Sequence, residues 1–303
     1  MRFSVWPSPE RTWNELCDVA RAADAGGWHG IWFADHYMPN TETGDVADGD
    51  VHECWAIVPG LAAVTERLRI GTLVAPTTVH HPAVLANRAA SIDLMSNGRL
   101  VLGIGAGWQV NEHQAYGIEL FEAADRVNRF EEAIQVVRSL LTQDRTTFEG
   151  RHFTITDAPC QPRPVQSPLP LLVGTGSPRM MRITARYADE WNTWGDPDEA
   201  ATRTGRFLAA CDAVGRDPAS VRRSAQAMVF MSDDEQRLAR FREQAPPERS
   251  LVGTPAELVD MLGRYVELGF DEFIVPDFTL GRDPARRADT YARFWTDVAA
   301  HLA

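Results

Sequence analysis

Strand-like and helix-like segments alternate along the whole chain, and this alternation limits the fold more than any other feature of the sequence. Several of the strand-like segments are near-continuous apolar runs, which is typical of parallel strands covered on both faces. The alternation therefore favours an α/β protein with a parallel sheet. Eight segments are predicted as strands: Arg2–Trp6, Gly30–Ala34, Leu68–Ala75, Leu100–Gly105, Leu171–Gly174, Glu190–Trp194, Ala225–Met231 and Glu272–Pro276.

Segments with helical spacing of apolar residues separate these strands. Between Trp13 and Ala25, apolar side chains recur every three or four residues, and Gly26-Gly27 ends the helix. A further helix opens at Cys54 and Trp55. The pattern predicts helices at Trp13–Ala25, Ala83–Met95, Arg126–Leu141, Pro178–Tyr187, Glu199–Val214, Pro255–Leu268 and Pro284–Leu302.

Eight strands, each followed by a helix, predict a single (β/α)8 TIM barrel domain over residues 1–303, a fold that needs about 250 residues. The surplus lies in two insertions, Gly107–Ala124 after the fourth strand and Gln143–Pro170 before the fifth. The second insertion contains Thr147–Thr154, which is predicted to form a β-hairpin. A doubly wound sheet is the alternative, but it needs a glycine-rich turn after the first strand, where Pro7-Ser8-Pro9 stands.

Composition argues against several classes of function. The net charge of −12 disfavours binding to nucleic acid or to an anionic membrane, because both need a basic surface. The chain contains no lysine, which excludes a lysine Schiff base and a P-loop lysine. No apolar run approaches the roughly 20 residues of a membrane span, and the first residues lack the apolar core of a signal peptide. Four widely spaced cysteines favour reduced thiols in a cytoplasmic protein, and no histidine spacing predicts a metal site.

Functional side chains of a barrel gather at the carboxyl ends of its strands. The second strand runs into Asp35-His36. An imidazole can exchange a proton near neutral pH, and a neighbouring carboxylate can orient it. The alternative is structural, with Asp35 capping the next segment and His36 packing as a polar lid. The position at a strand end favours the acid–base interpretation, so Asp35 and His36 are the candidate catalytic residues.

The turn Gly174-Thr175-Gly176-Ser177, at the end of the fifth strand, is a candidate anion site. Glycines let the backbone approach a ligand, and the helix that follows offers free N–H groups. The alternative is a tight turn in which Ser177 caps that helix. Arg179 and Arg182 either help to hold an anion there or carry surface charge.

The end of the fourth strand is rich in glycine. Gly103, Gly105 and Gly107 lack the spacing of a dinucleotide-binding turn, so we expect them to clear space for a flat ligand. Trp108 and Trp194 either pack against a ring system or lie buried in the barrel rim.

Five stretches of the sequence resemble the bacterial luciferase-like monooxygenase superfamily, and their order is specific to it. They are Arg69–Val74, His81–Ala86, Gly98–Trp108, Leu172–Gly176 and Ala185–Asn192. Asp35-His36-Tyr37 and Ala106-Gly107-Trp108 most resemble the branch of that superfamily that uses the deazaflavin coenzyme F420 rather than FMN.

The resemblance implies a (β/α)8 barrel that binds the deazaflavin at its carboxyl mouth. A non-prolyl cis peptide behind the ring would fall at Leu73–Val74, followed by Ala75, and His36 would lie at the reactive face of the ring. Family members are commonly homodimers. The other residues implied to contact the cofactor are Asp35, Gly105, Gly107, Trp108 and Asn111, with its phosphate at Gly174, Thr175, Gly176 and Ser177.

The sequence departs at two positions from the F420-dependent glucose-6-phosphate dehydrogenases of this branch. Trp108 stands where the resemblance implies an acid, and Pro76 stands where it implies a hydroxyl residue near the ring. A sugar-phosphate substrate is therefore disfavoured. A bulkier and more apolar pocket favours an alcohol, an enone, an imine or a nitroaromatic.

We therefore predict hydride transfer between C5 of F420 and a small organic substrate, with His36 giving or taking the proton and Asp35 fixing its tautomer. An FMN-dependent monooxygenase that uses O₂ is the first alternative. A protein that carries a flavin-like ligand without turnover is the second, and a carrier has no need of an acid–base pair. Titration with F420 and with FMN separates these interpretations.

Overall fold

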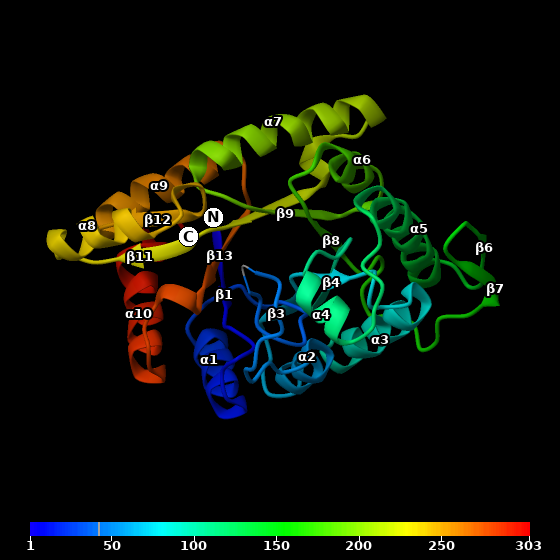
Figure 1. Cartoon of the computed structure of the whole chain (residues 1–303), viewed down its shortest axis with the longest axis horizontal. Helices are drawn as coiled ribbons and strands as arrows, with labels where there is room; N and C mark the ends of the chain where they lie inside the picture. The colour runs from blue at the N-terminus through cyan, green and yellow to red at the C-terminus, as the bar shows by residue number, and fades with distance from the viewer. Residues whose placement is uncertain (42) are drawn as a thin grey trace.

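The computed structural model describes residues 1–41 and 43–303. Its centre is a parallel barrel with the strand order β3-β2-β1-β13-β10-β9-β8-β5-β4 (Figure 1). Because β3 also pairs with β5 and is continued by β4, the ring closes with eight strand positions, which confirms the predicted (β/α)8 barrel. The strands are β1 (Arg2–Trp6), β2 (Gly30–Phe33), β3 (Arg69–Thr72), β4 (Ala75–Pro76), β5 (Leu100–Gly105), β8 (Leu171–Gly174), β9 (Glu190–Trp194), β10 (Arg222–Gln226) and β13 (Glu272–Pro276).

Helices follow the strands and cover the outside of the barrel (Figure 1). Every predicted helix is present. Five of them, α3, α6, α7, α9 and α10, begin with proline, whose missing N–H is not needed at a helix start. Within residues 1–41 and 43–303, no helix combines the length and the hydrophobicity that a membrane crossing requires. The covering helices are α1 (Trp13–Ala25), α2 (Cys54–Ala62), α3 (Pro82–Met95), α5 (Ala123–Thr142), α6 (Pro178–Tyr187), α7 (Pro197–Val214), α9 (Pro255–Glu267) and α10 (Pro284–Asp297).

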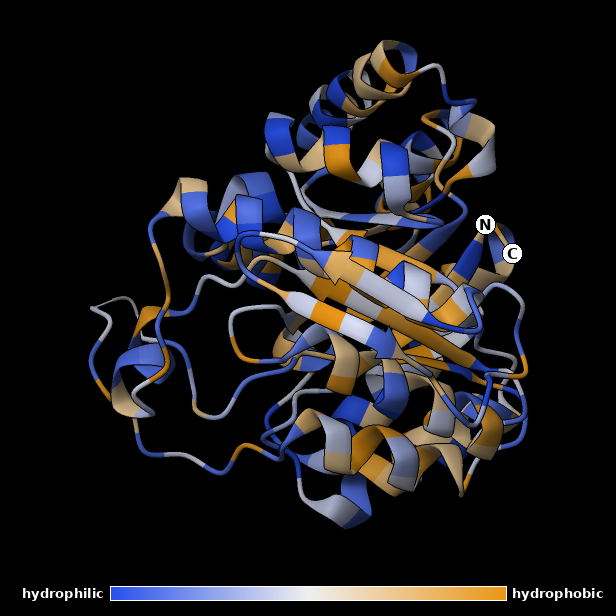
Figure 2. Cartoon of the chain, turned by 90° about the vertical axis from the view of Figure 1, so that its right-hand side faces the viewer, coloured by the Kyte–Doolittle hydropathy of each residue, from blue (hydrophilic) through white to orange (hydrophobic). Residues whose placement is uncertain are grey.

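Two apolar layers stabilise the barrel. The larger lies between strands and helices, and Figure 2 shows hydrophobic residues concentrated on the central strands. The smaller fills the interior with six buried side chains: Trp6, Trp32, Leu73, Val101, Leu172 and Ile274. At the amino end, Arg69 pairs with Glu190 at 2.5 Å and with Glu272 at 3.7 Å. Paired polar groups therefore occupy that end of the barrel.

The structure agrees with the prediction for one of the two insertions and differs from it for the other. Gln143–Pro170 contains the predicted hairpin, formed by β6 (Thr146–Glu149) antiparallel to β7 (Thr154–Ala158). Gly107–Ala124 was expected to be a loop but contains a short helix, α4 (Val110–Ala115). Six residues are too few to show a helical period, so no pattern in the sequence indicated α4.

The segment Ala225–Met231, predicted as one strand, is divided in the structure. The barrel strand β10 starts earlier than predicted. It begins with two arginines and a serine, so it has no apolar run that would indicate a strand. The apolar residues that suggested a strand form β11 (Met228–Met231), which pairs with β12 (Ser250–Gly253) in a separate two-stranded sheet. Helix α8 (Glu235–Gln244) was not predicted, because Leu238 is its one buried residue.

Candidate active site

A cavity of about 530 Å³ opens at the carboxyl end of the barrel. The predicted positions His36, Leu73–Val74 and Gly174–Gly176 meet in its wall. The lining residues are Trp6, Ala34, His36, Asn40, Leu73, Val74, Pro76, Gly107, Trp108, Glu112, Gly174, Thr175, Gly176, Asn192, Thr193, Trp194, Arg203, Gln226, Arg249 and Phe278.

His36 lies in the cavity wall just after β2, and Glu112 of α4 holds its ring. Nδ1 of His36 is 2.9 Å from Oε1 of Glu112, and the backbone N–H of Tyr37 donates to Oε2 at 2.9 Å. The Glu112 side chain is 2% exposed, so both hydrogen bonds are shielded from water. A carboxylate accepts from Nδ1–H, which leaves Nε2 as the nitrogen of His36 that can exchange a proton with a ligand.

Asp35 does not orient His36, which corrects the prediction from sequence. Its side chain is fully buried and does not line the cavity. Oδ2 of Asp35 accepts from Nε1 of Trp55 at 2.9 Å and from Nε2 of His80 at 2.7 Å. Neighbouring side chains of a strand alternate between its two faces, and these two side chains diverge as the chain leaves β2. Glu112 takes the orienting role that was assigned to Asp35.

The Leu73–Val74 peptide bond is cis, as the family resemblance predicted, and both side chains line the cavity. Glycines of β5 and β8 make room for Val74. A Cβ at Gly105 would lie 2.6 Å from Cγ2 of Val74, and a Cβ at Gly174 would lie 3.1 Å from its Cγ1. At Gly103 the obstacle would be a backbone carbonyl oxygen at 1.9 Å. Gly103 and Gly105 therefore accommodate the protein's own chain, which corrects the expectation that they clear space for a ligand.

Besides Asp35, four of the predicted cofactor contacts lie outside the cavity lining. Ala75 is fully buried in β4, and Gly105 lies beneath Val74. Asn111 donates to two backbone carbonyls of the loop after β2. Ser177 caps α6 with its hydroxyl, which is the structural alternative given above. These residues support the site rather than line it.

The turn Gly174–Gly176 lines the cavity beside β8. The N–H of Gly176 has no acceptor in the part of the chain that the structure describes. The guanidinium of Arg203 lies against the same residue, since a Cβ at Gly176 would be 2.9 Å from its Cζ. Arg179 and Arg182 do not line the cavity. The candidate anion site therefore includes Arg203, which the sequence did not indicate.

Both predicted tryptophans line the cavity. The ring of Trp108 meets that of His36 edge-on, with centroids 5.5 Å apart. Trp194 packs against Trp6, with centroids 5.4 Å apart, and Trp6 packs in turn against Phe278 at 5.3 Å. One side of the cavity is therefore aromatic.

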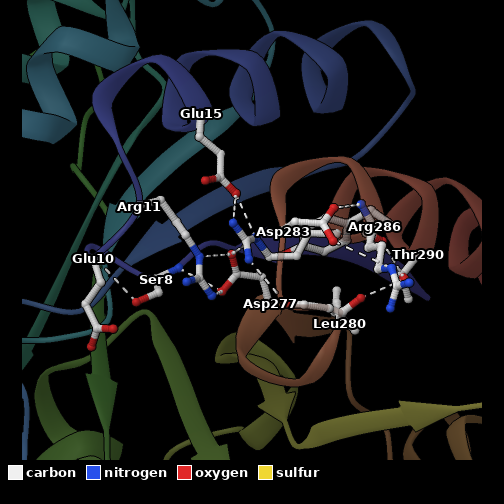
Figure 3. Close-up of polar contacts among 12 residues, drawn as sticks. Ser8, Glu10, Arg11, Glu15, Asp277, Leu280, Asp283, Arg286 and Thr290 are labelled. Carbon is white, nitrogen blue, oxygen red and sulfur yellow. Dashed lines mark hydrogen bonds and ion pairs between the residues drawn. The ribbon is translucent and has the colours of Figure 1, made fainter.

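A buried ion network holds the rim of the cavity next to this aromatic side. Arg11 donates to both oxygens of Asp277, at 2.9 and 3.0 Å (Figure 3). Arg287 of α10 pairs with Glu15 of α1 at 2.6 Å and lies 3.9 Å from the same aspartate. Asp277 directly precedes Phe278, so the network anchors the backbone next to that ring.

Comparison with known proteins shows to which family this chain belongs. The sequence model of the luciferase-like monooxygenase family matches residues 1–245. This chain belongs to that family. An F420-dependent glucose-6-phosphate dehydrogenase of Microbacterium testaceum is 30% identical over 91% of each chain. An F420-dependent hydroxymycolic acid dehydrogenase of Mycobacterium tuberculosis is 28% identical over 73% of this chain and 60% of its own length.

Solved structures share the whole barrel of this family member. An F420-dependent secondary alcohol dehydrogenase, in complex with an F420-acetone adduct, matches 98% of both chains with a TM-score of 0.83 and 19% identity. The monooxygenase RslO1 from Streptomyces bottropensis matches 100% of both chains with a TM-score of 0.82 and 21% identity. At such identities the likeness shows a shared fold, and it confirms the barrel.

Proposed function

We propose that this chain is an F420-dependent oxidoreductase that transfers a hydride between C5 of the deazaflavin and a small organic substrate. Relatives named as F420-dependent dehydrogenases support the choice of cofactor. The observation that carries the proposal is the His36–Glu112 pair in the cavity wall. Hydride transfer to or from oxygen or nitrogen compounds is coupled to a proton, which an oriented acid–base group can exchange.

The residues of the cavity fit a planar ring that carries a phosphate. Leu73 and Val74 form an apolar surface for the ring. The Gly174–Gly176 turn, with its free amide and with Arg203 beside it, would hold the phosphate. The indole N–H of Trp6 is buried without an acceptor among the described residues, and a ligand oxygen would satisfy it.

Three residues of this chain would assist the reaction. When bound, the deazaflavin supplies the hydride acceptor or donor. Nε2 of His36 gives or takes the proton at the substrate oxygen or nitrogen, while Glu112 keeps Nδ1 protonated and stabilises the imidazolium. Trp108 meets the His36 ring edge-on and shields that side of it from water. General acid–base catalysis contributes about 10²–10⁴-fold, and this is the loss of turnover expected for His36→Ala.

The substrate that we propose is an alcohol, an enone, an imine or a nitroaromatic. Among the described lining residues, Glu112 is the one carboxylate, and two N–H groups already occupy it. Nδ2 of Asn192 donates to Oε1 of Gln226 at 2.6 Å, so these two atoms are also engaged. A sugar needs several free hydrogen-bond partners for its hydroxyl groups. The aromatic side of the cavity suits a less polar substrate better.

We also propose that two copies of the chain associate and that the protein works in the cytoplasm. Exposed apolar side chains on α3, those of Val84, Leu94 and Met95, favour an interface. All four cysteines are free and buried, as expected in a reducing compartment. Sedimentation equilibrium at micromolar concentration measures the mass, and a monomer would contradict the association.

Titration with F420 and with FMN, followed by cofactor fluorescence, tests the proposed cofactor. We expect F420 to bind and FMN to bind weakly or not at all. His36→Ala should retain F420 binding and lose turnover of a secondary alcohol. Binding of FMN without binding of F420 would overturn the proposal in favour of an FMN-dependent monooxygenase.

A further inference from the structure

The aromatic side of the cavity presents a large apolar surface next to the proton-exchanging histidine. Trp6 is 5% exposed and forms its inner wall, whereas Phe278 is 43% exposed and lies at the opening. Trp194 and Phe278 both pack against Trp6, so the three rings form one continuous aromatic surface. A ligand body that contacts this wall must itself be largely apolar, since water is released from both surfaces.

Arg249 lies at the mouth of the cavity with its guanidinium over the face of Trp194, and its Cζ is 5.5 Å from the ring centroid. Stacking uses the flat face of the guanidinium and leaves the N–H groups at its edge free for a planar oxyanion. Within residues 1–41 and 43–303, no acidic side chain pairs with it.

The other charged groups of the cavity are already engaged. Arg203 donates to Glu199 at 2.5 Å and to Thr193 at 3.0 Å. Glu112 accepts from His36 and from a backbone amide. Arg203 lies in addition against the turn proposed to hold the F420 phosphate. Arg249 is therefore the arginine of the described cavity lining whose guanidinium no described residue engages by a hydrogen bond or an ion pair.

We propose that the substrate is an apolar or aromatic acid. Its body lies against Trp6, Trp194 and Phe278, and Arg249 holds its carboxylate or phosphate at the mouth. This inference rests on the proposed function, and it narrows the substrate to molecules that carry an anionic group away from the reacting atom. The same oxyanion chemistry is present in the phosphate and tail carboxylates of F420. The arginine next to the Gly174–Gly176 turn, where the F420 phosphate is proposed to bind, is however Arg203 and not Arg249.

Calorimetric titration of F420-saturated protein with 2-naphthoate and with its neutral analogue 2-naphthamide tests the inference. The two probes share the aromatic body and differ in charge. We expect wild type to bind the carboxylate about fivefold more tightly, as for a solvent-exposed ion pair. Arg249→Gln should remove this preference, Arg249→Lys should retain part of it, and Arg206→Gln, on the exposed face of α7, should keep it. No preference in wild type, or a preference unchanged in Arg249→Gln, would overturn the inference.

A second measurement distinguishes the two sources of the oxyanion. F420 affinity should be the same in wild type and in Arg249→Gln. If Arg249→Gln instead weakens F420 binding and leaves the naphthoate preference intact, Arg249 serves the cofactor tail and the inference is wrong. The probe titration is repeated on protein without F420, so that failure of wild type to bind F420 counts against the proposed function alone.

Discussion

Replacement of Glu112 by glutamine is expected to slow hydride transfer without weakening the binding of F420. The carboxylate accepts two N–H groups at once, Nδ1–H of His36 and the backbone N–H of Tyr37, each at 2.9 Å. A glutamine side chain has one oxygen, so one of the two donors would face an NH₂ group. The His36 ring then loses either its orientation or its fixed tautomer, while the surfaces that contact the cofactor stay in place.

The expected size of the effect follows from this geometry. A hydrogen bond to a charged group contributes about 1.5–3 kcal/mol, and the 2% exposure of Glu112 means that solvent weakens it little. Since about 1.4 kcal/mol corresponds to tenfold in rate, the chemical step should slow by about 10–150-fold. The loss should appear in kcat, because His36 acts in the transition state.

Stopped-flow absorbance of F420 at saturating substrate measures the chemical step, and fluorescence titration measures the affinity for the cofactor. Asp35→Asn is the matched control, because it removes the same charge one residue from His36 but disturbs His80 and Trp55 instead. Asp35→Asn should lower the melting temperature and change the rate little. A rate for Glu112→Gln within about twofold of wild type, or an equal loss in folded Asp35→Asn, would refute the reasoning.

Three other perturbations test the barrel around the site. Burial and the charges of three neighbouring arginines lower the pKa of His29 to about 3, so stability should fall as the pH drops from about 6.5 toward 3, by about 1–2 kcal/mol at pH 5. His29→Gln should flatten this decline in urea unfolding, and an unchanged decline would contradict the assignment. Gly105→Ala places a Cβ 2.6 Å from the valine in the cavity wall and should weaken F420 binding about fivefold or more, whereas Gly205→Ala, with open space around it, should not. Asp277→Ala leaves Arg11 without its carboxylate and should cost about 3 kcal/mol in chemical unfolding; a cost below about 1 kcal/mol would show that the network does not hold the rim.

The barrel could be predicted from the sequence because its strands and helices are repetitive and local. Apolar runs such as Leu100–Gly105 indicate strands covered on both faces. A proline at the start and apolar residues at helical spacing indicate helices such as Pro178–Tyr187. Once the barrel is assumed, the carboxyl ends of the strands must meet. The gathering of His36, Leu73–Val74 and Gly174–Gly176 follows from that topology alone.

The partners within the site could not be predicted, because they depend on side-chain directions between distant segments. Glu112 lies 76 positions after His36, on a helix too short to leave a pattern. Asp35 was favoured as the partner by adjacency, yet adjacent side chains point apart where a strand ends. Arg203 lies in α7 and Arg249 ends a 3-10 helix of three residues, both far along the chain. Nothing local separates them from the other arginines.

The position of the His36 side chain depends on contacts with α4 more than on the loop that contains it. Gln109, at the start of α4, donates to the carbonyl of Met38 at 3.0 Å, and Asn111 donates to two further carbonyls of the loop after β2. These bonds reach backbone atoms, so they do not depend on which side chains the loop carries. Substitutions in the loop should therefore alter substrate preference and leave His36 in place. Substitutions at Gln109, Asn111 or Glu112 should instead lower the rate for every substrate, because they move the one group that exchanges the proton.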